Sequence, residues 1–232
     1  MTDLTRLRYI LFIQGQQGLV TLEESLKYTR NIICVVPKGF SNTKIVNLCL
    51  SHKIKVLKRA KDQQIDVKEY NCDVLISSQF QFRIHKKEFK ALSKGAINIH
   101  ASILPKYKGK HSDVWALIND EKILGITVHK INEEFDDGEI LHIEKIKIND
   151  SMTNKEIYQT ILELLPKIIK LIFNNLIFKN TIKNKGQDIF WRARNLSDSR
   201  INWNLNCRKV FLFIRALARE PIYAYSSYKG ET

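Results

Sequence analysis

The sequence predicts an α/β protein whose mostly parallel sheet is flanked by helices, with a small appendage at its C-terminal end. Two patterns lead to this class. Short apolar runs, several of them closed by glycine or proline, recur through the first hundred residues, and stretches of helical character lie between them. This alternation is typical of parallel strands joined by crossover helices. The length of 232 residues suits one sizeable α/β domain and an appendage.

The first half of the chain supplies five expected strands. The first ends at Gln14-Gly15-Gln16-Gln17-Gly18, which we expect to be a loop. The loop lacks the third glycine of a dinucleotide-binding turn, so that kind of site is not favoured. Strands are expected at residues 9–13, 31–36, around 56, 72–77 and 96–100, and helices at 22–28, 43–51, 63–70 and 86–92. Right-handed crossovers in this order give a Rossmann-like sheet.

The second half begins with an expected helix over residues 113–119. Residues 124–131 and 138–148 both alternate in polarity and are expected to pair as a long hairpin. Thr153 and Glu156 form a capping-box pattern before a helix that runs to about residue 173. Residues 176–186 are polar and basic and read as a connector. In the remaining tail we expect a helix at 210–217 and packing roles for Trp191 and Trp203.

The net charge is +14 and the pI is about 9.6. Such an excess favours anionic partners, namely nucleic acid, a nucleotide, a polyglutamylated cofactor or a membrane surface, without choosing among them. Lysines are spread along the whole chain, so part of the charge belongs to an ordinary solvated surface.

The four cysteines contain no CxxC pair, and no His/Cys cluster has the spacing of zinc ligands. We therefore expect reduced thiols, no bound metal and a cytoplasmic protein. No signal peptide is recognisable. The longest apolar run, residues 161–176, contains several charged residues and a proline, so insertion into a membrane is not expected.

Chemistry-bearing residues gather between residues 95 and 139. Asn98 and His100 are two apart on an expected strand and therefore project from the same face. A lysine-rich turn follows them, and Phe135-Asp136-Asp137-Gly138 forms a later turn that carries two carboxylates. An amide donor, an imidazole and a carboxylate around one strand end suffice for acyl transfer to an amine.

These residues also resemble a known family. The stretch Asn98-Ile-His100-Ala-Ser102-Ile-Leu-Pro105-Lys-Tyr107-Lys-Gly109 is similar to the N-x-H-x-S-L-L-P-x-Y-x-G signature of formyltransferases that use N10-formyltetrahydrofolate, with Ile103 in place of the first Leu. Residues 124–129 resemble the family's G-x-T-x-H strand, and residues 135–138 its catalytic-aspartate loop. The resemblance implies the formyltransferase fold, with residues 1–180 as the catalytic domain and residues 187–232 as a short C-terminal module, either small or truncated.

Within the family, the turn after Gly109 reads Lys110-His111-Ser112-Asp113-Val114-Trp115. A tryptophan on this helix and a short tail resemble the sugar-nucleotide N-formyltransferases. Glycinamide ribonucleotide formyltransferases carry a different first loop, and methionyl-tRNA formyltransferases carry a full C-terminal barrel. The resemblance thus implies a nucleotide-linked amino-deoxy sugar as substrate, in the making of a surface polysaccharide such as the O-antigen of lipopolysaccharide. Initiator tRNA is the alternative, and nucleic acid is otherwise not expected as a partner. A homodimer through the C-terminal part is also implied, although this tail is short.

The resemblance implies catalytic roles for Asn98, His100 and Asp136. Asn98 would donate to the oxyanion, Asp136 would support the imidazole, and His100 would either accept the amine's proton or share in stabilising the oxyanion. Asp137 is expected to set the turn, and His129 to have a structural or supporting role. The cofactor is expected near Ser78, Phe80, Phe82 and Ile84. The sugar nucleotide is expected near Lys106, Tyr107, Lys108, Lys110, His111 and Trp115.

Overall fold

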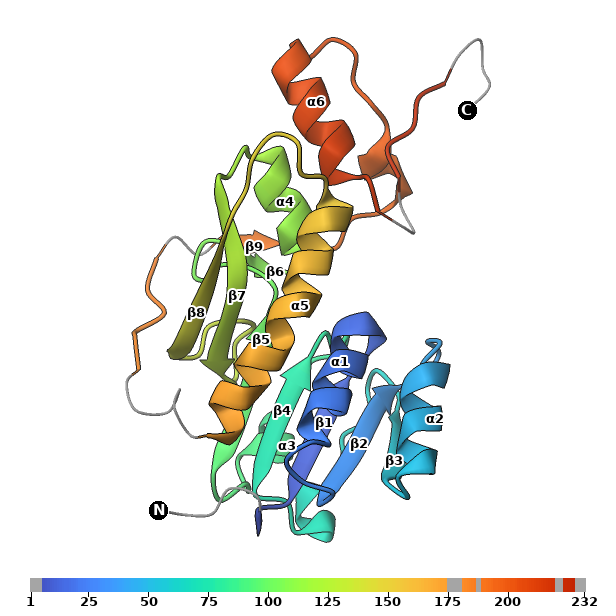
Figure 1. The fold of residues 1–232 in the computed structure, drawn as a ribbon, viewed down its shortest axis with the longest axis vertical. Helices are drawn as coiled ribbons and strands as arrows, with labels where there is room; N and C mark the ends of the chain where they lie inside the picture. Colours follow the sequence, from blue (N-terminus) through green and yellow to red (C-terminus); the bar gives the residue numbers. More distant parts are fainter. Residues whose placement is uncertain (1–5, 175–180, 187–188, 220–222, 228–232) are drawn as a thin grey trace. The chain divides into compact units, whose positions relative to one another are not determined.

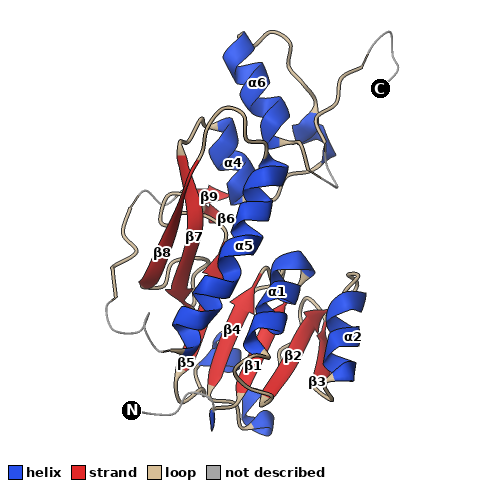
Figure 2. Ribbon diagram, viewed as in Figure 1, coloured by secondary structure: helices blue, strands red, loops and turns tan. Residues whose placement is uncertain are grey.

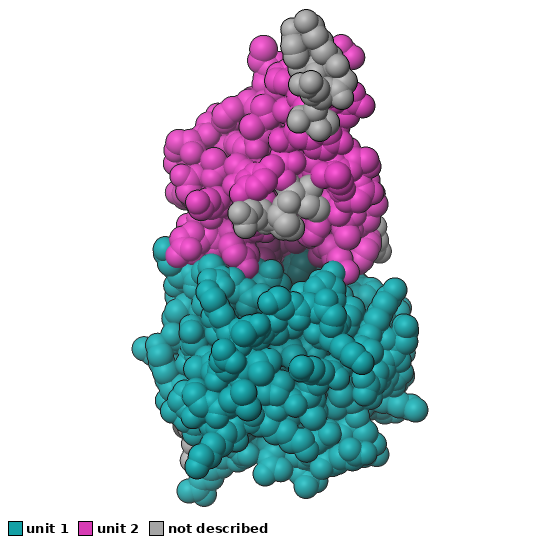
Figure 3. Space-filling model, turned by 90° about the vertical axis from the view of Figure 1, so that its right-hand side faces the viewer, with its two compact units in different colours: residues 1–100, 127–142, 162–184 teal, residues 101–126, 143–161, 185–232 magenta. Residues whose placement is uncertain are grey.

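The computed structural model describes residues 6–174, 181–186, 189–219 and 223–227. The chain forms two compact units, coloured separately in Figure 3. Unit 1 comprises residues 1–100, 127–142 and 162–184, and unit 2 comprises residues 101–126, 143–161 and 185–232. The predicted boundary between residues 180 and 187 falls where both flanking segments, 175–180 and 187–188, lie outside the described residues, and it stays a prediction.

A seven-stranded sheet of order β3-β2-β1-β4-β5-β7-β8 organises the fold. The first five strands are parallel, and β7 joins β5 in the antiparallel sense. This confirms the predicted mostly parallel, helix-flanked sheet (Figures 1 and 2). The strands are β1 (Tyr9–Ile13), β2 (Ile32–Pro37), β3 (Lys55–Arg59), β4 (Val74–Ser78), β5 (Gly95–His100), β7 (Ile123–Lys130) and β8 (Ile140–Lys147).

Strands β1, β2 and β4 are buried along their whole length. Near-continuous apolar sequence is what a parallel sheet covered on both faces requires. Residues of β1, β2 and β4 form one core cluster with Val67 and Leu92. Tyr9 is next to Ile10 on β1 and therefore points to the opposite face of the sheet. There Phe173 packs against the rings of Tyr9 and Tyr28, with ring centroids 4.8 Å apart in both pairs.

Three helix predictions in unit 1 are corrected. Helix α1 (Gly15–Ser25) begins directly after β1, so the residues expected to be a loop form its first turn. Gly18 must be small there, because a Cβ on it would lie 2.9 Å from Ile13 Cβ. The helix expected over 63–70 is a short 3-10 turn, η2 (Val67–Tyr70), and the one expected over 86–92 is the single turn α3 (Lys86–Phe89). Helix α2 (Thr43–Ser51) has its predicted bounds.

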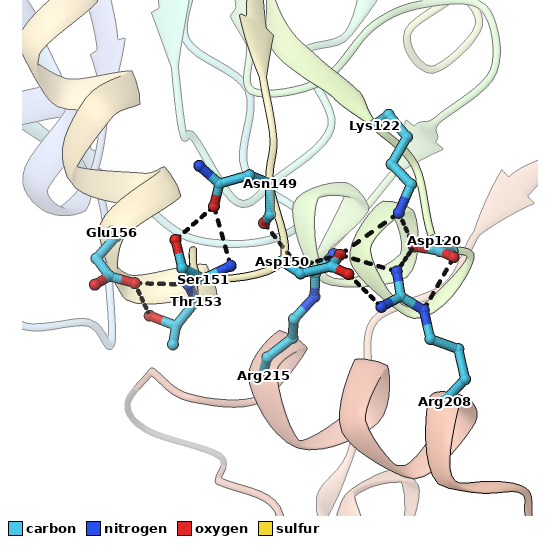
Figure 4. Close-up of polar contacts among 9 residues, drawn as sticks. All are labelled: Asp120, Lys122, Asn149, Asp150, Ser151, Thr153, Glu156, Arg208 and Arg215. Carbon is cyan, nitrogen blue, oxygen red and sulfur yellow. Dashed lines mark hydrogen bonds and ion pairs between the residues drawn. The ribbon is translucent and has the colours of Figure 1, made fainter.

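Helix α5 (Asn154–Phe173) belongs to unit 2 at its start and to unit 1 at its end. It begins directly after Thr153, and Glu156 lies in its first turn, as the predicted capping-box pattern requires. The Glu156 carboxylate accepts hydrogen bonds from both the backbone N–H and the hydroxyl of Thr153, at 2.6 and 2.7 Å (Figure 4). Among the described residues, no helix is both long enough and apolar enough to cross a membrane.

Unit 2 contains α4 (Ser112–Ile118), the short parallel pair β6 (Lys108–Gly109) and β9 (Phe190–Trp191), the 3-10 turn η3 (Leu196–Ser199) and α6 (Cys207–Ala216). Trp191 stacks between Tyr107 and Trp115, with centroids 5.7 and 5.1 Å away. Its predicted packing role is therefore confirmed. The same prediction for Trp203 is wrong, because Trp203 is 63% exposed.

Arg208 fastens α6 within unit 2. Its guanidinium bonds to Asp120, in the turn after α4, and to Asp150, in the turn after β8, with the shortest contacts at 2.6 Å (Figure 4). Arg215, two turns further along the same face of the helix, donates to Asn149 O at 2.9 Å. Two turns of unit 2 are thus tied to one helix by arginine side chains.

Candidate active site

Strand β5 presents Asn98 and His100 on the same face, as the two-residue spacing predicts. Pairing with β7 adds a third side chain. His129 lies directly opposite Asn98 in the antiparallel register, so their side chains share that face. The neighbouring parallel strand β4 ends beside them, with Ser77 opposite Asn98 and Ser78 opposite Ile99. The carboxyl ends of parallel strands are the usual place for a ligand site in such a sheet.

The carboxylate of Asp136 reaches this face from the loop after β7. Its Oδ1 lies 3.4 Å from Asn98 Nδ2, 3.4 Å from His129 Nε2 and 3.7 Å from His100 Nδ1. The three partners are largely buried, as is Asp136, whose side chain is 12% exposed. Residues 38 positions apart in sequence therefore meet in one small polar cluster inside unit 1.

The contacts of His129 fix its proton. Its Nδ1 lies 2.8 Å from Lys130 O, and a carbonyl oxygen can only accept, so Nδ1 carries the hydrogen. In the neutral ring Nε2 is then an acceptor, and it faces Asn98 Nδ2 at 3.1 Å. The amide orientation of Asn98 follows from this network: its NH2 group points toward His129 and Asp136. His129 thus sets the direction of the candidate oxyanion donor.

The loop that carries Asp136 is pinned by neighbouring parts of unit 1. Asp136 has φ of +51°, in the left-handed region. At Gly138 a Cβ would lie 1.8 Å from Lys130 O, so only glycine lets the loop return so closely to β7. Arg83 donates to Glu133 O and places its guanidinium 5.3 Å from the centre of the Phe135 ring. Arg83 was not singled out from the sequence, because nothing local distinguishes it from other surface arginines.

The predicted cofactor residues lie at and just after the end of β4. Ser78 is fully buried, and its Oγ has no hydrogen-bond partner among the described residues. Phe80 and Ile84 pack onto the core cluster. Phe82 is half-buried, edge-on to Phe80, and its ring centre is 5.9 Å from that of the exposed Phe40.

A buried ion pair supports this segment. Arg59 Nε lies 2.9 Å from Glu88 Oε1, both side chains are fully buried, and Arg59 Nη2 donates to Arg83 O at 2.7 Å. Burial lowers the pKa of Arg59, and the Glu88 carboxylate opposes this shift. Glu88 also accepts the backbone N–H of His85 at 2.8 Å. Through these hydrogen bonds the buried pair fixes the backbone of residues 83–85.

The predicted substrate residues all belong to unit 2. Lys106 pairs with Glu121, whose carboxylate also accepts from the Tyr107 hydroxyl at 2.8 Å. Burial raises the pKa of Tyr107 well above its usual value. Lys108 is buried, while Lys110 is exposed. The ring of Trp115 stacks on Trp191, and its Nε1–H donates to Arg192 O.

His111 is the last of the predicted substrate residues. It has a left-handed backbone, and its Nδ1 accepts the backbone N–H of Arg194 at 3.1 Å. Desolvation lowers the pKa of His111, the cations Arg194, Arg219 and Lys110 lower it further, and Asp113 opposes them. The structure thus places the six residues in one unit and the catalytic and cofactor candidates in the other.

Known proteins resemble this chain at three levels. The sequence model of the formyl transferase family matches residues 29–172. A bifunctional polymyxin resistance protein ArnA from Wigglesworthia glossinidia brevipalpis is 29% identical over 95% of the chain, and a methionyl-tRNA formyltransferase from Thermodesulfovibrio yellowstonii is 37% identical over 64% of it. The chain spans only 36% and 49% of the lengths of these two relatives.

Among solved structures, an N-formyltransferase from Helicobacter canadensis, in complex with folinic acid and dTDP-3-aminofucose, superposes with a TM-score of 0.75 at 21% identity. The match covers 97% of this chain and 85% of that one. At this sequence identity, the structural similarity shows a shared fold only. The family model, by contrast, matches more than half of the sequence, and it includes every residue of the polar cluster around Asp136. The chain therefore belongs to the formyl transferase family.

Proposed function

We propose that the protein transfers a formyl group from N10-formyltetrahydrofolate to the primary amine of a nucleotide-linked amino-deoxy sugar. The observation that carries the proposal is the convergence of Asn98, His100 and His129 on one carboxylate oxygen of Asp136. The ligands named for the Helicobacter canadensis structure favour a folate donor and a sugar nucleotide acceptor.

The residues of unit 1 fit a folate. The exposed ring of Phe40 and the half-buried ring of Phe82 offer aromatic surface beside the end of β4, suited to a flat pteridine. When bound, the cofactor supplies the formyl carbon, which gains a bond to the amine nitrogen and loses its bond to N10, while N10 takes up a proton. Ser78, Phe80, Phe82 and Ile84 are the residues that we assign to this ligand.

Asn98 is the proposed donor to the oxygen of the formyl group. Its Nδ2 bonds to Asp136 at 3.4 Å, which is long for a hydrogen bond, so a substrate oxygen can take over that hydrogen at little cost. As negative charge builds on the oxygen, one well-placed donor is worth roughly 2.7–4 kcal/mol. His129 keeps the NH2 group facing the right way.

His100 and Asp136 are proposed to manage the proton. The attacking amine must lose one, and His100 is placed to accept it or to share in stabilising the oxyanion. Asp136, 3.7 Å from His100 Nδ1 and 3.4 Å from His129 Nε2, stabilises whichever ring becomes a cation. Asp137 keeps the role of shaping the turn.

For the acceptor, we assign the cluster in unit 2 that contains Lys106, Tyr107, Lys108, Lys110, His111 and Trp115. Lys106 and Lys110 are the exposed lysines of this set, and exposed cations suit a diphosphate. We further propose a cytoplasmic enzyme that supplies a surface polysaccharide precursor, with residues 1–180 as catalytic domain, residues 187–232 as an appended module, and a homodimer as its assembly.

The alternative acceptor is aminoacylated initiator tRNA. It is favoured by the net charge of +14 and by the methionyl-tRNA formyltransferase relative. It predicts binding to tRNA that weakens steeply as salt increases. Sugar-nucleotide transfer predicts saturable turnover at moderate salt without such binding.

The test is a turnover assay with N10-formyltetrahydrofolate and a panel of acceptors. Thymidine, uridine and guanosine diphosphate amino sugars are compared with charged initiator tRNA, and the formylated product is identified by mass spectrometry. Formylation of one sugar nucleotide supports the proposal. Formylation of tRNA alone replaces it with the alternative, and turnover of neither acceptor contradicts both.

A further inference from the structure

The loop that carries Asp136 is held by a side chain 48 positions away. The amide nitrogen of Asn184 donates to Asp136 O at 2.8 Å and to Gly138 O at 3.1 Å. A side-chain amide has two hydrogens, so both are used on these two carbonyl oxygens. Asn184 thereby bridges the turn across Asp137.

The chemistry of the partners fixes the orientation of this amide. Two carbonyl oxygens can only accept, so the Asn184 side chain must face them with nitrogen and not with oxygen. Its own Oδ1 is buried and has no hydrogen-bond partner among the described residues. The two donated bonds therefore define how this side chain sits.

The segment that carries Asn184 is itself anchored to the sheet. Ile182 forms an antiparallel bridge with Ile140 at the start of β8, with N–O distances of 2.8 Å in both directions. The turn is thus constrained at two points: Gly138 lies so close to Lys130 O that a Cβ would not fit, and Asn184 donates to Gly138 O. Residues 181–184 act as a strap on the loop and not as a plain connector.

The strap contacts the backbone of Asp136, which has an unfavourable conformation. Asp136 has φ of +51°, which a residue with a side chain adopts only when its surroundings impose it. The peptide carbonyl of Asp136 accepts the hydrogen bond from Asn184. The direction of this peptide and the direction of the carboxylate toward Asn98, His100 and His129 depend on the same backbone angles.

We propose that Asn184 is a positioning residue for catalysis: it holds the Asp136 turn in the conformation that aims the carboxylate at the Asn98, His100 and His129 cluster. This role in catalysis rests on the proposed function, whereas the control of the loop by Asn184 does not. Asn184 touches the backbone of the loop, so it is expected to affect kcat and leave substrate binding almost unchanged.

The sharpest test is Asn184→Asp, which keeps the shape of the side chain and replaces two donors by acceptors facing two carbonyls. We expect kcat to fall about tenfold to a hundredfold. KM should stay within about twofold, because no substrate contact is removed. Asn184→Ala, which removes the bonds without adding repulsion, should lie between this variant and the native chain, and Asn184→Gln, which keeps the NH2 group, should recover part of the loss. Asn174→Asp, the same change at an exposed position of unit 1, should leave activity unchanged.

A second measurement needs no turnover. In NMR spectra, the ring resonances of His100 and His129 report the position of the Asp136 carboxylate, and Asp136→Asn shows what they become without its charge. Asn184→Asp and Asn184→Ala should shift both sets of resonances toward those of Asp136→Asn. If the native chain transfers no formyl group to any acceptor, the proposed function fails. The shifts of the histidine resonances would still test whether Asn184 controls the Asp136 loop.

Three results would contradict the proposed positioning role of Asn184. One is unchanged kcat and unchanged histidine resonances in Asn184→Ala. Another is a rise in KM alone, which would make Asn184 a substrate contact. The third is a loss of activity that only follows the loss of folded protein in thermal unfolding; Asn184→Ala decides this if Asn184→Asp does not fold.

Discussion

Two aspartates of this protein show opposite uses of a carboxylate. Asp136 in unit 1 is largely buried and lies 3.4–3.7 Å from Asn98, His100 and His129. Asp150 in unit 2 is more than half exposed and meets Arg208 at 2.6 Å, and this guanidinium also bonds to Asp120 (Figure 4). Short, charge-assisted bonds hold a structure in one state. Long contacts with groups that can lose or gain a proton allow partners to be exchanged.

The same contrast separates two buried polar clusters of unit 1. Arg59 and Glu88 are fully buried, and Glu88 is further used by the backbone of Ile65 and His85. That pair fixes the segment after β4. The cluster around Asp136 lies on the same sheet and contains neutral donors and imidazoles. Burial alone therefore does not distinguish the two clusters, whereas the length of their contacts does.

The largest effect is expected at the Asp136 cluster. Asp136→Asn, Asn98→Ala and His100→Ala should each lower kcat by about 10² to 10⁴, because each removes a proton-handling or oxyanion-stabilising group. Steady-state kinetics with the acceptor found in the panel measures this. Asp137→Asn is the matched control in the neighbouring position and should keep nearly full activity; the reverse ranking of the two aspartates would assign the catalytic role to Asp137.

The next effect concerns stability. Glu88→Gln should lower the free energy of unfolding by about 3–5 kcal/mol, because it leaves the Arg59 cation buried without its counter-charge. Urea denaturation followed by circular dichroism measures the loss. Glu139→Gln breaks the ion pair with Lys130, in which both side chains are about half exposed, and should cost at most about 1 kcal/mol. Equal losses of unfolding free energy for the two changes would mean that the buried pair stabilises the fold no more than the exposed pair does.

A smaller effect on activity is expected at His129. His129→Leu removes the acceptor that orients the Asn98 amide and should lower kcat about tenfold to a hundredfold, less than loss of Asn98 itself. His129→Gln, whose amide oxygen can still accept, should recover part of the activity. Combining His129→Leu with Asn98→Ala should add little to the effect of Asn98→Ala alone, because the two residues act as one unit; full additivity would show independent roles.

The smallest effect is expected in unit 2. Hydrogen bonds from Arg208 lower the pKa of Asp150 from 3.8 to about 2. The folded-state pKa lies below the unfolded one, so the pair stabilises the fold above about pH 4, and this contribution disappears as the pH falls toward 2. Arg208→Met should lower the melting temperature slightly at pH 7 and should make stability fall less steeply between pH 4 and pH 2. Lys209→Met, at the exposed neighbouring position, should change neither quantity.

Much of the fold could be predicted from local sequence. Apolar runs gave the strands of the parallel sheet, because a strand covered on both faces has to be apolar along its length. The helix start at residue 15 was missed, since Gln14 makes no side-chain cap and no acidic residue marks the first turn. The expected helix over 63–70 shortened to η2 because tertiary packing overrides weak propensity.

Of the candidate site, the sequence by itself determined Asn98, His100 and the turn with Asp136, because a period of two and a compact turn are local features that can be read along the chain. The tertiary structure alone decided that His129 lies opposite Asn98, that Arg83 and Asn184 hold the Asp136 loop, and that one carboxylate oxygen lies near three side chains. Apart from the approach of His129 to Asp136, these contacts join residues that are 31 to 52 positions apart. Strand register and loop closure, rather than local composition, determine such pairings.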